Sequence, residues 1–145
     1  MANVFDVAKY ILDTVGGDIS AMKLQKLCYY CQAWNLVWEG EPLFKEEFLR
    51  WDNGPVCKEL FNLHKGMYFA NGEKLFTGNE NFFSKEGLST KQTENIDGVL
   101  DEYMHFEGSE LSEMTHQEDP WKNTKKNKVI EKEQIKEFYA QRINK

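Results

Sequence analysis

The stretch KLQKLCYYCQAW, residues 23–34, carries two cysteines in C-x-x-C spacing beside two tyrosines, and its interpretation decides the fold. Ser20 precedes it as a helix cap, and Gly40 follows it as a helix stop. Between these residues apolar side chains occupy almost the whole circumference of a helix, and a helix that is apolar all round is a buried one. We therefore predict a buried central helix over residues 20–40, around which the rest of the chain packs.

One face of this predicted helix gathers large or soft apolar side chains, namely Leu24, Leu27, Cys28, Cys31, Trp34 and Trp38. The clearest polar stripe consists of Gln25, Gln32 and Glu39, which are spaced by seven residues. Because Trp34 shares its face with leucines and cysteines, we expect it to be structural. Truncating such a buried aromatic costs about 3–5 kcal/mol.

The C-x-x-C pair suits a structural interpretation better than a chemical one. A redox pair of this spacing follows a strand and sits at a helix N-terminus, where the dipole lowers one thiol pKa, whereas Cys28 and Cys31 lie in mid-helix. A zinc site needs four ligands and usually a second paired set, but Cys57 stands alone. We expect all three cysteines to be core side chains that bind no metal and form no disulfide.

Other segments carry further helix signals. Asn3 can cap a helix whose apolar residues recur at helical spacing until Gly16. Ser89 with Gln92 resembles a capping box at the start of another helix, and shorter helical patterns follow Ser109 and occupy the end of the chain.

Two glycine turns lie between these helices. The sequence NGP at residues 53–55 signals a turn, with Pro55 suited to the first turn of a helix that carries Val56. The sequence NG at residues 71–72 lies between short apolar runs and indicates a small hairpin near residues 68–76. The predicted fold is mainly α: a compact single-domain bundle of five or six helices around the buried central helix, with at most that one small β-hairpin.

Length and composition favour one domain over residues 1–145. No apolar run approaches the ~20 residues of a membrane span, and the N-terminus lacks the basic-then-apolar pattern of a signal peptide. Three cysteines are an odd number, so a disulfide framework is not expected. We predict a cytoplasmic protein that does not enter a membrane.

The net charge of −6 is unevenly distributed. Residues 121–145 hold eight Lys/Arg and three Glu, so residues 1–120 carry −11. Between Glu94 and Asp119 there are nine acidic residues and no Lys or Arg. An acidic body repels nucleic acid and attracts basic partners. Direct nucleic-acid binding is therefore not expected, and the basic tail is best interpreted as solvated surface.

Catalytic groups are sparse. The three histidines, His64, His105 and His116, share no metal-ligand spacing, and neither a nucleophile elbow nor a phosphate-cradling glycine loop occurs. The one arrangement with acid–base potential is His116 near Glu118 and Asp119. We expect no catalytic residue, no metal and no cofactor, and keep a small enzyme using His116 as a minor alternative.

Three blocks, in order, resemble the Panacea domain antitoxin family, which includes SocA-like and phage-associated GepA-like proteins. Residues 23–44, KLQKLCYYCQAWNLVWEGEPLF, resemble the family's Lys-Leu, Lys-Leu, Tyr, Gln, Trp and Leu pattern. Residues 48–60, FLRWDNGPVCKEL, carry an aromatic followed by Gly-Pro-Val. Residues 110–121, ELSEMTHQEDPW, carry Leu, Thr-His and Pro-Trp. The first and last helices also lie where the family's do, so the resemblance spans about residues 3–140.

The resemblance implies a compact helical domain that neutralises a cognate, co-encoded toxin by direct binding. Members of the family pair with structurally unrelated toxins, many of which block translation, and some resemble adaptors that hand a toxin to a protease, here a AAA+ protease. An acidic body suits a toxin with a basic surface. The alternative is a phage or host regulatory module, or a proteolytic adaptor, without a toxin partner. We expect no separate DNA-binding domain beside the core, and a homo-oligomer stays open.

Two sets of residues carry these expectations. The structural motif comprises Leu24, Leu27, Tyr30, Trp34, Gly54, Pro55 and Val56. Partner binding is predicted around the turn before Pro55, because a core does not need its polar and aromatic groups and because Trp and Arg often dominate binding energy at interfaces. The predicted partner-binding residues are Arg50, Trp51, Asp52, Asn53, His64, His116 and Trp121.

Arg50 and Asn53 depart from the resemblance, since the family tends to have a small residue and often an aromatic there. Such a departure is expected if each antitoxin is tuned to one toxin. The alternative for this region is that Trp51 packs inward and that the turn only leads into a helix. The acidic surface of residues 94–119 is the next candidate for partner binding.

Overall fold

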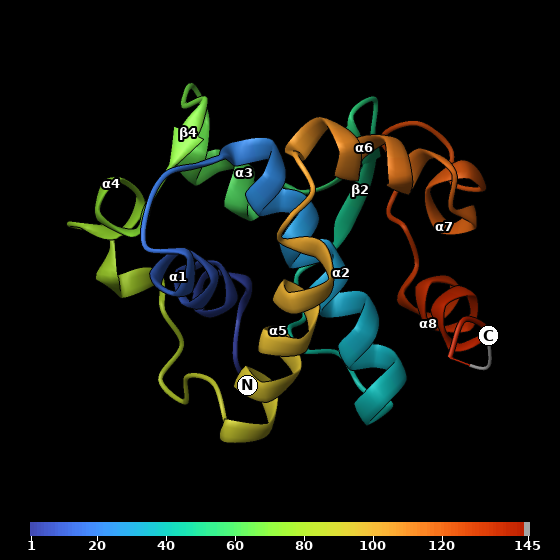
Figure 1. Ribbon diagram of the computed structural model, residues 1–145, viewed down its shortest axis with the longest axis horizontal. Helices are drawn as coiled ribbons and strands as arrows, with labels where there is room; N and C mark the ends of the chain where they lie inside the picture. Colours follow the sequence, from blue (N-terminus) through green and yellow to red (C-terminus); the bar gives the residue numbers. More distant parts are fainter. Residues whose placement is uncertain (144–145) are drawn as a thin grey trace.

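A computed structural model describes residues 1–143 and is organised around one long helix, α2 (Ala21–Glu39), which crosses the middle of the molecule (Figure 1). The side chain of Ser20 accepts the amide of Lys23 at the helix start, and Gly40 ends the helix in the left-handed conformation. The predicted central helix is confirmed, and most of its residues are buried.

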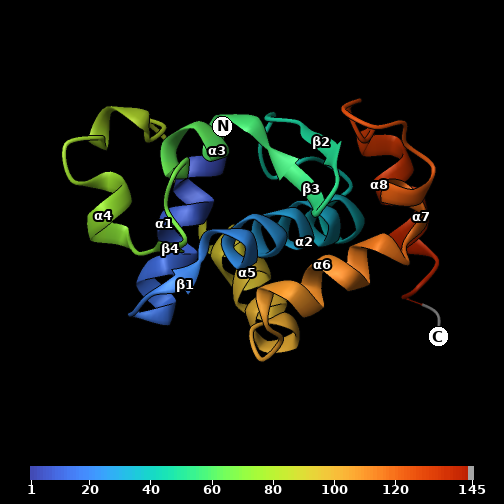
Figure 2. The same cartoon turned by 90° about the horizontal axis from the view of Figure 1, so that it is seen from above.

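Shorter elements surround α2 on every side. The helical ones are α1 (Val4–Val15), α3 (Lys58–His64), α4 (Gly72–Phe76), the 3₁₀ helix η1 (Glu80–Phe82), α5 (Thr90–Tyr103), α6 (Gly108–His116), α7 (Asp119–Lys122) and α8 (Lys132–Ala140). Seen from above, α5 and α6 lie on one side of α2, and α3 lies on the other together with a hairpin (Figure 2). The pair α1 and α4 occupies one end of the molecule, and α7 and α8 occupy the opposite end (Figure 2).

The mainly helical class is confirmed, with eight α-helices in the described part of the chain. Two of them, α4 and α7, are single turns of five and four residues that the sequence pattern did not reveal. Pro120 opens α7, where its missing N–H costs no hydrogen bond. No helix among residues 1–143 is long and apolar enough to cross a membrane.

The hairpin lies at residues 48–57 rather than near residues 68–76. It pairs β2 (Phe48–Trp51) with β3 (Gly54–Cys57) in antiparallel fashion. Pro55 therefore belongs to a strand, and α3 begins only at Lys58. The expectation that Pro55 opens a helix was wrong, because cross-strand pairing with Arg50 takes precedence over the helix signal.

The prediction of a hairpin near residues 68–76 was wrong for a local reason. Asn71 does not form a tight turn but caps α4, its side chain accepting the amide of Lys74 at 2.8 Å. The short strand before it, β4 (Phe69–Ala70), pairs instead with the distant β1 (Ile19–Ser20).

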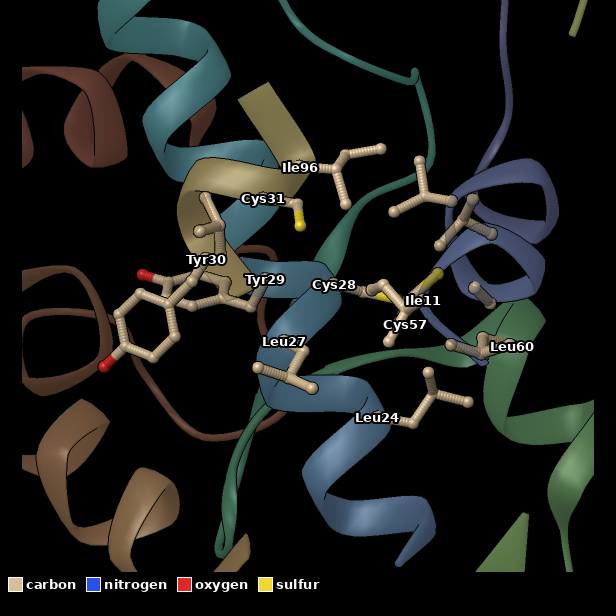
Figure 3. Packing of buried hydrophobic residues seen from close by; sticks show 14 of the residues in the cluster. Ile11, Leu24, Leu27, Cys28, Tyr29, Tyr30, Cys31, Cys57, Leu60 and Ile96 are labelled. Atoms are coloured by element: carbon tan, nitrogen blue, oxygen red, sulfur yellow. The ribbon is translucent and has the colours of Figure 1, made fainter. Parts of the chain in front are cut away.

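The hydrophobic core runs along α2 and contains all three cysteines (Figure 3). Cys28 lies toward Ile11 and Cys57, and Cys31 lies on the side of Ile96 (Figure 3). Burial raises the pKa of all three thiols, which keeps them protonated and unreactive. The expected core placement of the C-x-x-C pair is confirmed.

The tryptophans of α2 are less buried than predicted. Trp34 is half-buried against the core and donates its indole N–H to the Tyr103 hydroxyl at 2.9 Å. Trp38 is 43% exposed and stacks on Trp34, so its expected core position was wrong. It lies in the last turn of α2, where the neighbour on α5 is the small residue Gly98.

Candidate partner-binding site

The β2–β3 hairpin holds most of the predicted partner-binding residues. The last residue pair of its two strands is Trp51 and Gly54. Asp52 and Asn53 therefore form a two-residue turn with exposed side chains. The hydroxyl of Ser112, on α6, donates to the carbonyl of Asn53 and ties the turn to the helical body.

A second tie runs along the outer edge of β2, where residues 127–130 lie beside the strand. The amide of Arg50 donates to the carbonyl of Lys128 at 2.9 Å, and the amide of Asn127 donates back to the carbonyl of Arg50 at 2.8 Å. The hairpin is thus hydrogen-bonded on both edges of β2, which fixes the geometry of the surface it presents.

Gly54 allows the hairpin to lie close against the helices. Its φ of 116° is accessible to glycine but strained for other residues. A Cβ atom at this position would lie 2.6 Å from Cε of Lys26 and 2.8 Å from Oγ1 of Thr115. The glycine of the Gly-Pro-Val motif is therefore required by both conformation and space.

Lys26 lies directly beneath the hairpin, and sequence analysis did not single it out. Its side chain is only 1% exposed, and Nζ donates to the carbonyl of Pro55 at 3.2 Å. Among residues 1–143 no carboxylate forms an ion pair with it. Burial lowers the pKa of Lys26 from 10.5 to about 7, because the charged ammonium loses its hydration without gaining a counter-charge.

Gln25 joins α2 to the hairpin and to α3. Its side-chain oxygen accepts the amide of Cys57 at 2.9 Å, and its side-chain nitrogen donates to the carbonyl of the same residue at 3.1 Å. The same nitrogen lies 3.0 Å from Nε2 of His64, which must then accept. His64 is therefore neutral, and burial lowers its pKa, which favours that state. Gln25, a member of the polar stripe of α2, therefore binds the backbone of Cys57.

A cavity of about 400 Å³ opens between α2, α3, the hairpin and residues 126–127. Its walls combine polar and apolar groups from Met22, Gln25, Lys26, Trp51, Asn53, Val56, Phe61, His64 and Asn127. Trp51 packs edge-on against Phe61 with ring centroids 5.0 Å apart, and Phe61 packs in the same way against His64 at 5.5 Å. Four predicted partner-binding residues, namely Trp51, Asp52, Asn53 and His64, line this one cavity.

The other three predicted residues form a stack of their own. Arg50 lies over the ring of Trp121 with Cζ 3.7 Å from its centroid, and the ring of His116 lies 4.2 Å from the same tryptophan. The indole N–H of Trp121 donates to the carbonyl of Trp51 at 2.8 Å. Successive residues of a strand point to opposite faces. Arg50 therefore contributes to this stack on one face of β2, and Trp51 contributes to the cavity wall on the other.

The acid–base arrangement considered for His116 does not form. Glu118 points into the core, where it accepts the hydroxyls of Tyr30 at 2.8 Å and Tyr139 at 2.6 Å. Burial raises the pKa of Glu118. The acidic neighbour of His116 is instead Glu113, with Nδ1 to Oε1 at 3.9 Å. Among residues 1–143 no group of three or more His, Cys, Asp or Glu side chains could hold a metal ion.

The sequence contains a feature that could have indicated the importance of Lys26, although the helical pattern did not single it out. Lys26 is a charged residue between Gln25 and Leu27 in a helix that is apolar nearly all round. A charge in such a helix either reaches the surface or is buried with a purpose. The partner-binding role of the seven predicted residues stays a prediction.

The geometry defines a small, mainly helical protein whose distinctive surface is an anchored hairpin over a cavity. The family model of the antitoxin SocA-like, Panacea domain matches residues 24–122, which is more than half of the chain. The protein belongs to the SocA-like antitoxin, Panacea domain family, as the three sequence blocks predicted. No curated protein and no solved structure gives a significant match.

Proposed function

We propose that this protein is an antitoxin that neutralises a cognate protein toxin by binding it directly at the hairpin surface. We define the hairpin surface as Arg50, Trp51, Asp52 and Asn53 together with the cavity beneath them. The family match carries the proposal, because residues 24–122 include the whole hairpin and most of the cavity wall.

The chemistry of the hairpin surface supports this role. Arg50, Trp51 and the neighbouring Trp121 are half-buried, and β2, which carries the first two, is hydrogen-bonded on both of its edges. Rigid aromatic and arginine side chains contribute strongly to binding energy at interfaces.

The charge distribution supports a basic partner. Eight of the nine acidic residues between Glu94 and Asp119 are exposed, and they lie on or beside α5 and α6. Complementary charge steers encounter and suppresses wrong partners. A toxin that acts on RNA in translation would bring a basic surface of this kind.

The test is co-expression with the product of the adjacent gene, scored by growth. Wild type is expected to restore growth, and Asp52→Lys is expected to lose neutralisation, because a charge reversal in an interface with a basic partner creates like-charge contact. Glu137→Lys, an equal charge change at an exposed position on α8, is the matched control and is expected to neutralise like wild type.

Two outcomes would count against the proposal in different ways. Failure of the wild-type protein to restore growth argues against an antitoxin role for this gene pair. Full neutralisation by Asp52→Lys argues against the hairpin surface and moves the interface to the acidic surface of α5 and α6.

A further inference from the structure

We infer that the cavity beneath the hairpin is a carboxylate receptor, in which Lys26 binds an acidic side chain or the C-terminal carboxylate of the partner protein. The inference rests on the proposed function in one respect only, namely that the partner is the cognate toxin. It names the chemical group that the toxin must insert.

Lys26 is the anchor because its bonding capacity is mostly unused. An ammonium group has three N–H donors, and within residues 1–143 Nζ makes one hydrogen bond, at 3.2 Å, to the carbonyl of Pro55. Among the same residues no acidic side chain pairs with it, although the side chain is buried. Buried charges in proteins are normally paired, and a carboxylate from outside would supply the missing counter-charge.

The two other buried polar side chains of the cavity wall, Gln25 and His64, already have hydrogen-bond partners. Gln25 uses both ends of its amide on the backbone of Cys57, and its nitrogen is also shared with His64. The neutral His64 therefore acts as an acceptor at Nε2 and does not compete for an anion there. Lys26 is left as the buried cation of the cavity, because Lys126 at the rim is mostly exposed and pairs with Asp52.

The apolar walls and the size of the cavity specify what surrounds the carboxylate. Trp51, Phe61, Val56 and Met22 line it, so the group beside the acid should be apolar or aromatic. A volume of about 400 Å³ accommodates one or two residues rather than a whole helix. A C-terminal residue with an apolar side chain fits, as does an Asp or Glu next to an apolar residue.

Three other titratable groups face the cavity from the elements packed around Lys26. Asp52, in the hairpin turn, pairs with Lys126 at 3.5 Å, and both side chains are mostly exposed. His64, on α3, is neutral through its bond to Gln25. Because Asp52 has its own counter-charge, it does not neutralise Lys26.

Binding should therefore be linked to proton uptake. In the free protein burial holds the pKa of Lys26 at about 7, and a carboxylate beside it raises that pKa. Below the pKa of Lys26 in the free protein, the amine is charged and its attraction to the carboxylate of the toxin is fully present. This attraction is lost as the pH rises through the higher pKa that Lys26 has in the complex. Affinity for the toxin is expected to fall between pH 7 and pH 9.

The experiment measures binding of the whole protein to its purified toxin by calorimetry, in two buffers of different ionisation enthalpy and across that pH range. Lys26→Met keeps the shape of the side chain and removes the charge, and should weaken binding about tenfold or more at pH 7 while abolishing the linked proton uptake. Lys23→Met is the matched control, because Lys23 lies on the same helix and also donates to a backbone carbonyl, that of Met104. It should bind like wild type.

Toxin variants distinguish the two sources of the carboxylate. Removing the last two residues of the toxin tests the C-terminus, and replacing its exposed Asp and Glu residues singly by Asn and Gln tests the side chains. One of these changes should reproduce the loss and the missing proton uptake seen with Lys26→Met. If none does so, the inference is overturned.

A second measurement does not depend on a variant. The pKa of Nζ of Lys26, followed by nitrogen NMR in the wild-type protein, should rise when toxin is added. An unchanged pKa, or a Lys26→Met protein that binds with wild-type affinity and pH dependence, would overturn the receptor while leaving the antitoxin function standing. A wild-type protein that does not bind the toxin would refute the proposed function itself, and the receptor with it.

Discussion

Lys26 and Tyr30 lie one helical turn apart on the same side of α2, and both are buried, yet their surroundings are opposite in kind. Tyr30 donates to Glu118, which also accepts from Tyr139, and stacks on Tyr103 with ring centroids 4.1 Å apart. Lys26 meets one backbone carbonyl and a cavity. We call the first region the tyrosine cluster and the second the Lys26 cavity.

The two regions differ in whether the burial of a polar group is compensated within the fold. In the tyrosine cluster a buried carboxylate receives two hydroxyl donors, so its burial is compensated within the fold. In the Lys26 cavity a buried amine keeps unused donors, and burial lowers its pKa instead. A group that lowers stability without local compensation is typical of sites where function and stability are in conflict.

The largest effect is expected where the tyrosine cluster meets α2. Trp34→Ala removes a half-buried indole together with its hydrogen bond to Tyr103, and should lower the free energy of unfolding by about 3 kcal/mol. Trp38→Ala, at the more exposed ring stacked on Trp34, is the matched control with a smaller loss. Urea denaturation measures both losses. A Trp34→Ala protein as stable as wild type would mean that Trp34 does not stabilise the tyrosine cluster.

A smaller loss is expected for Tyr30→Phe, which leaves Glu118 with one tyrosine donor. Hydrogen bonds to charged groups contribute about 1.5–3 kcal/mol, and a loss of this order should appear in the melting temperature. Tyr29→Phe is the control, because the hydroxyl of Tyr29 is buried without a hydrogen-bond partner among residues 1–143. Equal effects of the two substitutions would mean that the Glu118 contact adds nothing.

Lys26→Met should behave differently, with a stability at pH 7 within about 1 kcal/mol of wild type, because loss of the bond to Pro55 is offset by removal of a buried amine. The pH dependence carries the signal. The pKa of Lys26 is about 7 in the folded protein and 10.5 in the unfolded chain. The contribution of Lys26 to the free energy of unfolding is therefore fully present above pH 10.5 and is lost as the pH falls toward 7.

Wild type should therefore gain stability relative to Lys26→Met as the pH rises from 7, by at most about 1.4 kcal/mol per pH unit. Below pH 7 the two stability curves should run in parallel. Denaturant titrations at several pH values measure the difference, and a difference that does not change with pH would contradict the burial of a neutral amine.

The smallest effect belongs to the rim of the Lys26 cavity. Asp52→Asn removes the ion pair with Lys126, whose partners are mostly exposed, and should change the free energy of unfolding by less than about 0.5 kcal/mol. Thermal denaturation checks this value. A larger loss would make the turn part of the structural framework and weaken its assignment as a binding surface.

Much of the fold follows from local signals. Ser20 and Gly40 delimit α2, and the continuous apolar pattern between them predicts its burial correctly. The same local reasoning failed at Asn71, where an asparagine that suits a turn also suits a helix cap. The choice between them depends on β1, a strand about fifty residues earlier in the chain, which takes up the residues expected to form the hairpin.

The candidate site was predictable only in part. The residue types at the turn pointed to Trp51, Asp52 and Asn53, which do line one cavity. Lys26 was missed because the hairpin that lies against it, through Gly54 and Pro55, is about thirty residues away in the sequence. Helical periodicity describes one helix at a time and does not indicate which remote backbone will cover a given position.

The pairing of residues 127–130 with β2 has a consequence for the order of synthesis. The outer edge of β2 leaves the ribosome long before its neighbour exists, since about eighty residues separate the two segments. During that interval the edge presents free amides and carbonyls, which can pair with other chains. A fragment ending at Lys122 retains the family-matched region with this edge open, and sedimentation should find it aggregated at concentrations where the 145-residue chain is not.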